Sequence, residues 1–151
     1  MSVCTFLASD YPLPSAAPPK DYPIEINIDT GMIDDGGADD NYYLHLFDDV
    51  DLYADKKYGV MLEWNYTDGR AEQIIKYIKE ALNNTDSIEL WHVWLGDYYE
   101  YEDSSVTHSR IVSVKDISIE DIKEIDSAKI WNQPDKIYPN RPSFYRLIIK
   151  R

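Results

Sequence analysis

Alternating apolar and polar positions predict a β-hairpin near the N-terminus. Residues 24–29 read Ile-Glu-Ile-Asn-Ile-Asp, which is the period of a strand with one buried face. Residues 42–47 predict a second strand, and Gly36 and Gly37 between the two strands can adopt the positive φ of a turn. Five prolines lie between Pro12 and Pro23, so we expect an extended arm before the hairpin.

A helix between two strands is predicted next. Residues 58–64 indicate a strand, and Thr67 or Asp68 can cap a helix that ends at about residue 83. Residues 88–95 are apolar on both alternations apart from Glu89 and His92, which is typical of a central strand covered on both faces. The helix is amphipathic, and its apolar stripe consists of Ala71, Ile74, Ile75, Ile78 and Leu82.

A second helix is predicted over about residues 119–126. Ser118 and Asp121 form a near capping box, in which Asp replaces the usual Glu or Gln. Ile117 and Ile122 have the spacing of a hydrophobic staple around the same helix start. This local signal specifies where the helix begins.

Strands at residues 106–114 and 143–150 complete the order β-α-β-β-α-β from Tyr58 onward, which is the ferredoxin-like arrangement. The predicted fold class is α+β, with a ferredoxin-like core over about residues 58–150, an added N-terminal hairpin, about six strands and two helices. In this core the last strand lies at an edge, where Arg146 and Lys150 would discourage pairing with another chain. We expect a single domain over residues 1–151, divided into a Pro-rich arm (1–23), an acidic hairpin region (24–55) and the α+β core (58–151).

Composition narrows the classes of function. The 151 residues include 28 Asp and Glu against 15 Lys and Arg, for a formal charge of −13, and 44% of them are hydrophobic. The apolar content argues against global disorder, and the negative charge argues against nucleic-acid binding because it repels phosphate. No apolar run is long enough to cross a bilayer, and the single Cys4 cannot form an internal disulfide. We therefore expect a cytoplasmic protein without a membrane partner.

The acidic segment from Asp21 to Asp55 is the most unusual feature of the sequence. It contains eleven Asp and Glu residues and no Lys or Arg. The simplest interpretation is a solvated loop; the others are a surface for a basic partner and a cation site. An EF-hand loop starting at Asp35 fails because its sixth position is Asp40 instead of Gly, so we predict no metal and no cofactor.

A tyrosine-rich segment at residues 97–103 is the second candidate for partner binding. Tyrosines in loops are efficient contact residues at interfaces, whereas the acidic residues between them argue against a platform for single-stranded nucleic acid. The alternative is an extended hairpin with packed tyrosines. The candidate partner-binding residues are Asp34, Asp35, Asp39, Asp40, Tyr98, Tyr99 and Tyr101.

The histidines suggest an alternative site. If the strands on either side of residues 97–105 paired as a hairpin, His92 and His108 would be near neighbours. Together with Glu63 they could line a pocket between the sheet and the N-terminal arm of a small enzyme or ligand-binding domain. However, buried structural histidines are more common, and the sequence has no nucleophile elbow, P-loop, dinucleotide fingerprint or HExxH motif.

Several segments resemble a group of small, acidic, uncharacterised bacterial proteins. They are Cys4-Thr5-Phe6-Leu7-Ala8, Tyr58-Gly59-Val60, Glu63-Trp64, Glu89-Leu90-Trp91-His92-Val93-Trp94-Leu95 and Arg141-Pro142-Ser143-Phe144-Tyr145. The resemblance implies a bacterial origin and transfers no functional residue. In its acidic, single-domain character the chain is also similar to immunity proteins that neutralise basic nuclease toxins.

The sequence thus favours a non-catalytic module that binds a basic protein, with an immunity-type inhibitor as the most concrete form. The small enzyme or ligand-binding domain is the alternative. A third interpretation is a structural module, in which an exposed aromatic sheet face would favour a homodimer.

Overall fold

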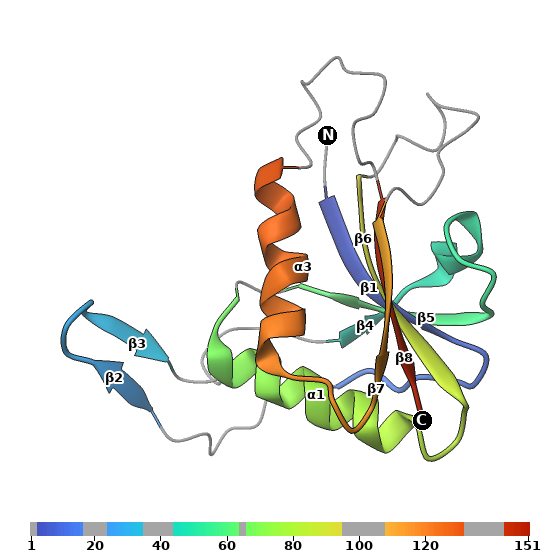
Figure 1. The fold of residues 1–151 in the computed structure, drawn as a ribbon. Coiled ribbons are helices and arrows are strands. Elements are labelled where there is room, and N and C mark those ends of the chain that lie inside the picture. Colours follow the sequence, from blue (N-terminus) through green and yellow to red (C-terminus); the bar gives the residue numbers. More distant parts are fainter. Residues whose placement is uncertain (1–2, 17–23, 35–43, 64–65, 95–107, 132–143) are drawn as a thin grey trace.

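The computed structural model describes residues 3–16, 24–34, 44–63, 66–94, 108–131 and 144–151. These residues form an α+β fold with two helices, a six-strand mixed sheet and a separate small hairpin (Figure 1). The elements are β1 (Val3–Ser9), β2 (Glu25–Asn27), β3 (Met32–Asp34), β4 (Leu44–Leu46), the 3-10 helix η1 (Asp48–Leu52), β5 (Tyr58–Leu62), α1 (Asp68–Ala81), β6 (Ser87–Trp94), β7 (His108–Ser113), α3 (Ile119–Trp131) and β8 (Phe144–Lys150).

Strand β1 lies inside the sheet, whose strand order is β4-β5-β1-β6-β8-β7. It pairs antiparallel with β5 on one side and with β6 on the other. Phe6 and Leu7 are both completely buried, although neighbouring side chains in a strand point to opposite faces. The sequence analysis placed this segment in the Pro-rich arm, because a strand covered on both faces lacks the polar alternation that identifies half-buried strands.

The N-terminal hairpin forms with a different partner strand from the one predicted. β2 pairs with β3, whereas β4 pairs with β5 at the edge of the large sheet, so the predicted pairing of residues 24–29 with residues 42–47 is wrong. The turn closes at Gly31, whose φ of 69° suits glycine and whose N–H donates to the Asn27 carbonyl at 2.8 Å. The Asn27 side chain also accepts hydrogen bonds from the amides of Asp29 and Thr30. The turn that the sequence suggested at Gly36 and Gly37 lies outside the described residues.

The ferredoxin-like arrangement is not confirmed. β5 and β6 are both antiparallel to β1, so the unit β5-α1-β6 connects parallel strands with β1 between them. The unit β7-α3-β8 connects two parallel strands that are direct neighbours. β8 therefore lies between β6 and β7, and the expectation that the last strand occupies an edge is wrong.

The two helices cover one face of the sheet (Figure 1). Both predicted helix starts are confirmed: the Thr67 hydroxyl accepts from the Arg70 amide at 3.1 Å, and the Asp121 carboxylate accepts from the Ser118 amide at 2.9 Å. α3 extends five residues beyond the predicted Asp126, to Trp131. The helix-side core includes Leu7, Val60, Leu90, Leu147, Ile74, Ile78, Ile122 and Ile125.

A smaller apolar cluster lies on the opposite face of the sheet, beneath η1. Val50 and Ala54 pack there against Phe6, Trp91 and other residues of the strands. The rings of Phe6 and Trp91 stack with centroids 6.0 Å apart and an interplanar angle of 4°. The sheet therefore separates two cores, and β1 contributes to both.

The two-sided burial of β1 predicts a large asymmetry between substitutions in the sheet. Phe6→Ala should lower the free energy of unfolding by about 3–5 kcal/mol, because it leaves a cavity between the sheet and η1. Ile111→Ala on β7 is the control, since Ile111 is 61% exposed, and should change stability by less than about 1 kcal/mol. Urea unfolding measures both values, and equal losses would contradict the central position of β1.

Candidate functional site

The segment around η1 holds aspartates on a rigid support. Val50 and Ala54 are buried against the sheet, and the Phe47 amide donates to the Gly59 carbonyl at 2.9 Å. The packing at Gly59 is close, because an added Cβ would lie 3.1 Å from both the Leu7 carbonyl oxygen and Val50. Anchoring by these apolar residues leaves the polar side of η1 directed to solvent.

Four carboxylates are exposed on that polar side, at Asp48, Asp49, Asp51 and Asp55. None of them forms an ion pair with any side chain that the structure describes. We call these four residues the η1 acidic surface. The sequence analysis included these residues in the acidic segment from Asp21 to Asp55 and did not name them as site residues. The signal that could have revealed it is the i, i+4 spacing of Val50 and Ala54 among the aspartates, which indicates a helical turn with one buried side.

A shallow, open hollow of about 590 Å³ adjoins the η1 acidic surface. On its floor the Lys56 ammonium group contacts the Asp10 carboxylate at 2.8 Å, and the exposed Lys57 lies 5.5 Å from the ring of Tyr58. Lys56 thus pairs with Asp10, and neither lysine forms a described ion pair with a carboxylate of η1. The residues lining the hollow are Asp10, Asp51, Leu52, Tyr53, Ala54, Asp55, Lys56 and Lys57.

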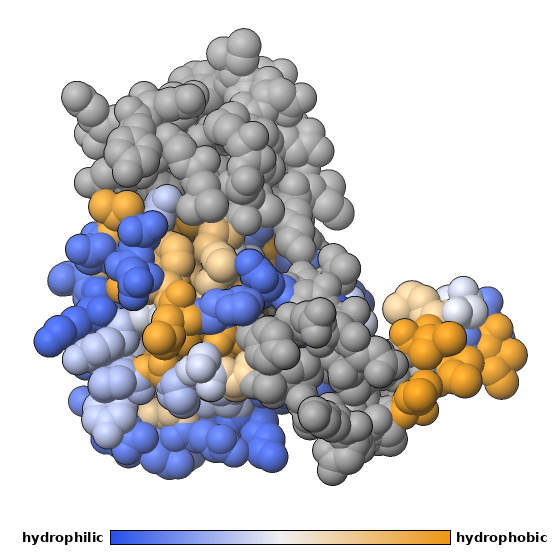
Figure 2. All heavy atoms as spheres, turned by 180° about the vertical axis from the view of Figure 1, so that it is seen from behind, coloured by the Kyte–Doolittle hydropathy of each residue, from blue (hydrophilic) through white to orange (hydrophobic). Residues whose placement is uncertain are grey.

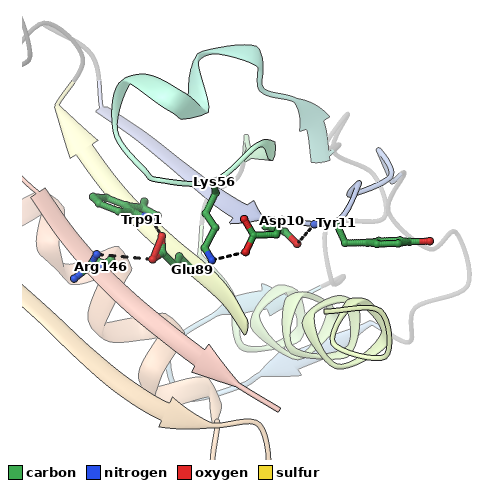
Figure 3. A network of polar contacts seen from close by, with 7 residues as sticks. Asp10, Tyr11, Lys56, Glu89, Trp91 and Arg146 are labelled. Atoms are coloured by element: carbon green, nitrogen blue, oxygen red, sulfur yellow. Dashed lines mark hydrogen bonds and ion pairs between the residues drawn. The ribbon is translucent and has the colours of Figure 1, made fainter. Parts of the chain in front are cut away.

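A polar cluster on the same face of the sheet connects β6 and β8 (Figure 3). The nearly buried Glu89 carboxylate accepts a hydrogen bond from the Trp91 indole at 3.0 Å and lies 3.8 Å from the Arg146 guanidinium group. The guanidinium group lies 5.5 Å from the centroid of the Trp91 ring, and its Nε donates to the Ser109 hydroxyl at 3.1 Å. These contacts satisfy the carboxylate and the indole within the protein, so we assign the cluster a structural role.

The predicted partner-binding residues are mostly outside the described part of the chain. Asp34 is the last residue of β3. The other six, Asp35, Asp39, Asp40, Tyr98, Tyr99 and Tyr101, lie outside the described residues. Their role as a binding surface stays a prediction.

The structure does not bring the described residues of the alternative pocket together. His92 is completely buried, and its Nδ1 lies 3.0 Å from the Thr5 hydroxyl. Glu63 is exposed and its carboxylate lies 3.3 Å from His45 Nε2. Strand alternation places Glu63 on the opposite face of the sheet from Leu62, and Leu62 shares its row with Thr5 and His92.

The hairpin that was expected to join the strands of His92 and His108 is absent from the sheet, because β8 lies between β6 and β7. Tyr145 of β8 is the register partner of both histidine positions, with His92 on one side and His108 on the other. The two positions are therefore two strand spacings apart, about 10 Å. The condition on which their proximity was expected, a hairpin of these two strands, is therefore not met.

Asp10 of the N-terminal arm lines the hollow beside η1, whereas described residues 13–16 pack against the fold. Leu13 packs into the helix-side core, and the Tyr77 hydroxyl donates to the Pro14 carbonyl at 2.6 Å. Ala16 exchanges two backbone hydrogen bonds with Leu44 of β4. These residues close the sheet edge instead of framing a cavity.

Within the described ranges, no group of three or more His, Cys, Asp or Glu side chains is placed to hold a metal ion. Likewise, no helix among the described residues is long and apolar enough to cross a membrane. Comparisons with protein-family models, with curated proteins and with solved structures found no match to this chain. The candidate site therefore depends on its own geometry and charge.

Glu89 supports a prediction about the polar cluster. Glu89→Ala should lower stability by about 1–3 kcal/mol, because it leaves the buried Trp91 indole N–H without an acceptor. Glu89→Gln is the matched control, since its amide oxygen can still accept a hydrogen bond from the indole. Its free energy of unfolding should decrease less than that of Glu89→Ala. Urea unfolding followed by tryptophan fluorescence compares the two variants. Equal losses would show that the ion pair with Arg146, and not the indole hydrogen bond, dominates.

Cys4 provides a prediction about pH dependence. Burial, with a smaller contribution from Glu63, raises the pKa of the Cys4 thiol from 9.0 to about 12. Between these two values the folded protein retains a proton that the unfolded chain loses, so Cys4 makes stability decrease as the pH rises through this window. The decrease should be at most about 1.4 kcal/mol per pH unit. Urea unfolding at pH 8 and pH 10.5 should show a smaller decrease for Cys4→Ala than for the wild type; parallel curves would contradict it.

Proposed function

We propose that this protein is a non-catalytic module that binds a basic protein partner through an acidic surface. The observation that supports this most is the η1 acidic surface, in which four exposed carboxylates project from a segment whose apolar side is anchored in the core. An anchored surface loses little conformational entropy on binding, which favours affinity. Uncompensated carboxylates also attract a cationic partner over distance and accelerate the encounter.

The charge distribution of the chain supports the same choice of partner. The formal charge of −13 disfavours nucleic acid and anionic lipid, whereas a basic protein gains from it. The predicted acidic and tyrosine residues at positions 34, 35, 39, 40, 98, 99 and 101 would extend this surface in the proposal. Tyrosine supplies large contact area with few rotatable bonds, so it complements the aspartates at an interface.

An immunity-type inhibitor is the most concrete form of the proposal. A protein that neutralises a basic toxin must associate quickly and cover a cationic surface, and acidic residues on a rigid scaffold meet both requirements. The alternative, a small enzyme or ligand-binding domain, receives no support from the described side chains, since His92 is buried and Glu63 pairs with His45.

Neutralising the η1 acidic surface tests the proposal. The variant Asp48→Asn/Asp49→Asn/Asp51→Asn should weaken binding to a basic partner about tenfold at low salt, mainly through a slower association rate. Its stability should be unchanged within about 0.5 kcal/mol, because these side chains are exposed. The matched control is Glu72→Gln/Glu80→Gln/Asp116→Asn, which removes the same number of exposed carboxylate charges away from η1.

The measurement is a pull-down from the source organism followed by surface plasmon resonance with the captured partner. The proposal expects a basic protein whose association rate decreases steeply between about 50 and 500 mM salt. Capture of only neutral or acidic proteins, or equal loss in both triple variants, would contradict it.

A further inference from the structure

The hairpin β2–β3 exposes an apolar face that the sequence predicted to be buried. Ile24, Ile26, Ile28 and Ile33 are 63%, 65%, 91% and 66% exposed. Ile26 and Ile33 are cross-strand partners, Ile24 directly precedes β2, and Ile28 begins the turn that follows β2. We call these four residues the hairpin apolar face. The hairpin projects from the body of the protein (Figure 1), and its hydrophobic side chains gather at the projecting end (Figure 2).

Among the described strands, β2 and β3 pair only with each other. A two-stranded ribbon with three residues per strand is marginal in water, and further packing is needed to stabilise it. Exposed apolar patches of this kind are typical of interaction sites. The hairpin is therefore a segment that gains stability when another surface covers its apolar face.

The charge of the hairpin specifies the chemistry of that surface. Residues 24–34 contain Glu25, Asp29 and Asp34 and no Lys or Arg. The formal charge of this segment is therefore −3, and it attracts cationic side chains of a partner. A second copy of the chain would instead bring the same three acids against their equivalents, and an anionic membrane would repel them.

We propose that the hairpin inserts its apolar face into an apolar groove of a partner protein whose rim carries Lys and Arg side chains. This inference rests on the proposed function, because it assigns a second contact to the same basic partner. The η1 acidic surface would provide steering, and the hairpin would provide the desolvated contact that slows dissociation.

A fluorophore on the hairpin tests the insertion. Ile28→Cys introduces an exposed thiol for an environment-sensitive dye, and the buried Cys4 competes little for the label. Ile111→Cys, on the exposed side of β7, is the matched control. The probes are an amphipathic Leu/Lys peptide, an oligolysine of equal charge, and vesicles of zwitterionic or anionic phospholipid. We expect a blue shift of the dye at position 28 with the Leu/Lys peptide only, and no shift at position 111.

Two hairpin variants measure the contribution to affinity. Ile26→Ser/Ile33→Ser should weaken binding of the Leu/Lys peptide about tenfold or more and leave oligolysine binding unchanged. Glu25→Lys keeps the apolar face and makes the charge of the hairpin segment less negative, so it should bind the cationic peptide less tightly. This second variant distinguishes the loss of a contact with the peptide from the loss of the hairpin itself.

The outcomes distinguish the two proposals. Unchanged affinity in both hairpin variants, with weaker binding in the η1 triple variant, would overturn the insertion and leave the proposed function intact. Unchanged affinity in all three would overturn both. A dye shift with vesicles would overturn the insertion in favour of a membrane surface. A dye shift that depends on protein concentration alone, with dimers in sedimentation, would overturn it in favour of a second copy of the chain.

Discussion

The burial of β1 on both of its faces is the constraint on which the rest of the structure depends. Leu7 packs beneath the two helices, and its neighbour Phe6 packs beneath η1. One strand thereby joins the helix layer to the acidic segment on the opposite side of the sheet. Because β1 also separates β5 from β6, it converts the β5-α1-β6 unit into a split unit and sets the strand order.

The position of the aspartates on η1 follows from the same strand. Phe6 and Gly59 provide the surface on which Val50 rests, and Val50 orients the turn so that its polar side is exposed. The acidic surface is thus held by apolar contacts and does not depend on ion pairs. Such a surface retains its shape as salt increases, while its attraction for a cationic partner is screened.

Local signals in the sequence were sufficient to predict the helices but insufficient to predict how the strands pair. The caps at Thr67 and Ser118 identified both helix starts, because capping hydrogen bonds involve residues three positions apart. The pairing of β2 with β3 and the insertion of β8 between β6 and β7 depend on long-range contacts that no local pattern encodes. For the site, the sequence shows the excess of acidic residues between positions 21 and 55. It does not show that Val50 and Ala54 anchor the aspartates of η1 to the sheet, because this contact depends on where β1 lies.

The distribution of ion pairs shows where the negative charge of the chain, formally −13, is compensated and where it is not. The described arginines are largely engaged within the protein: Arg110 contacts Asp121 and Glu124 of α3, and Arg151 contacts Asp86. These pairs join elements of the helix side and the chain end, so their positive charge is not available to η1. Among the side chains that the structure describes, the carboxylates of η1 therefore have no ion-pair partner. In the proposed function, a basic partner would supply cations to these carboxylates, so the proposal draws on the fold as well as on the composition.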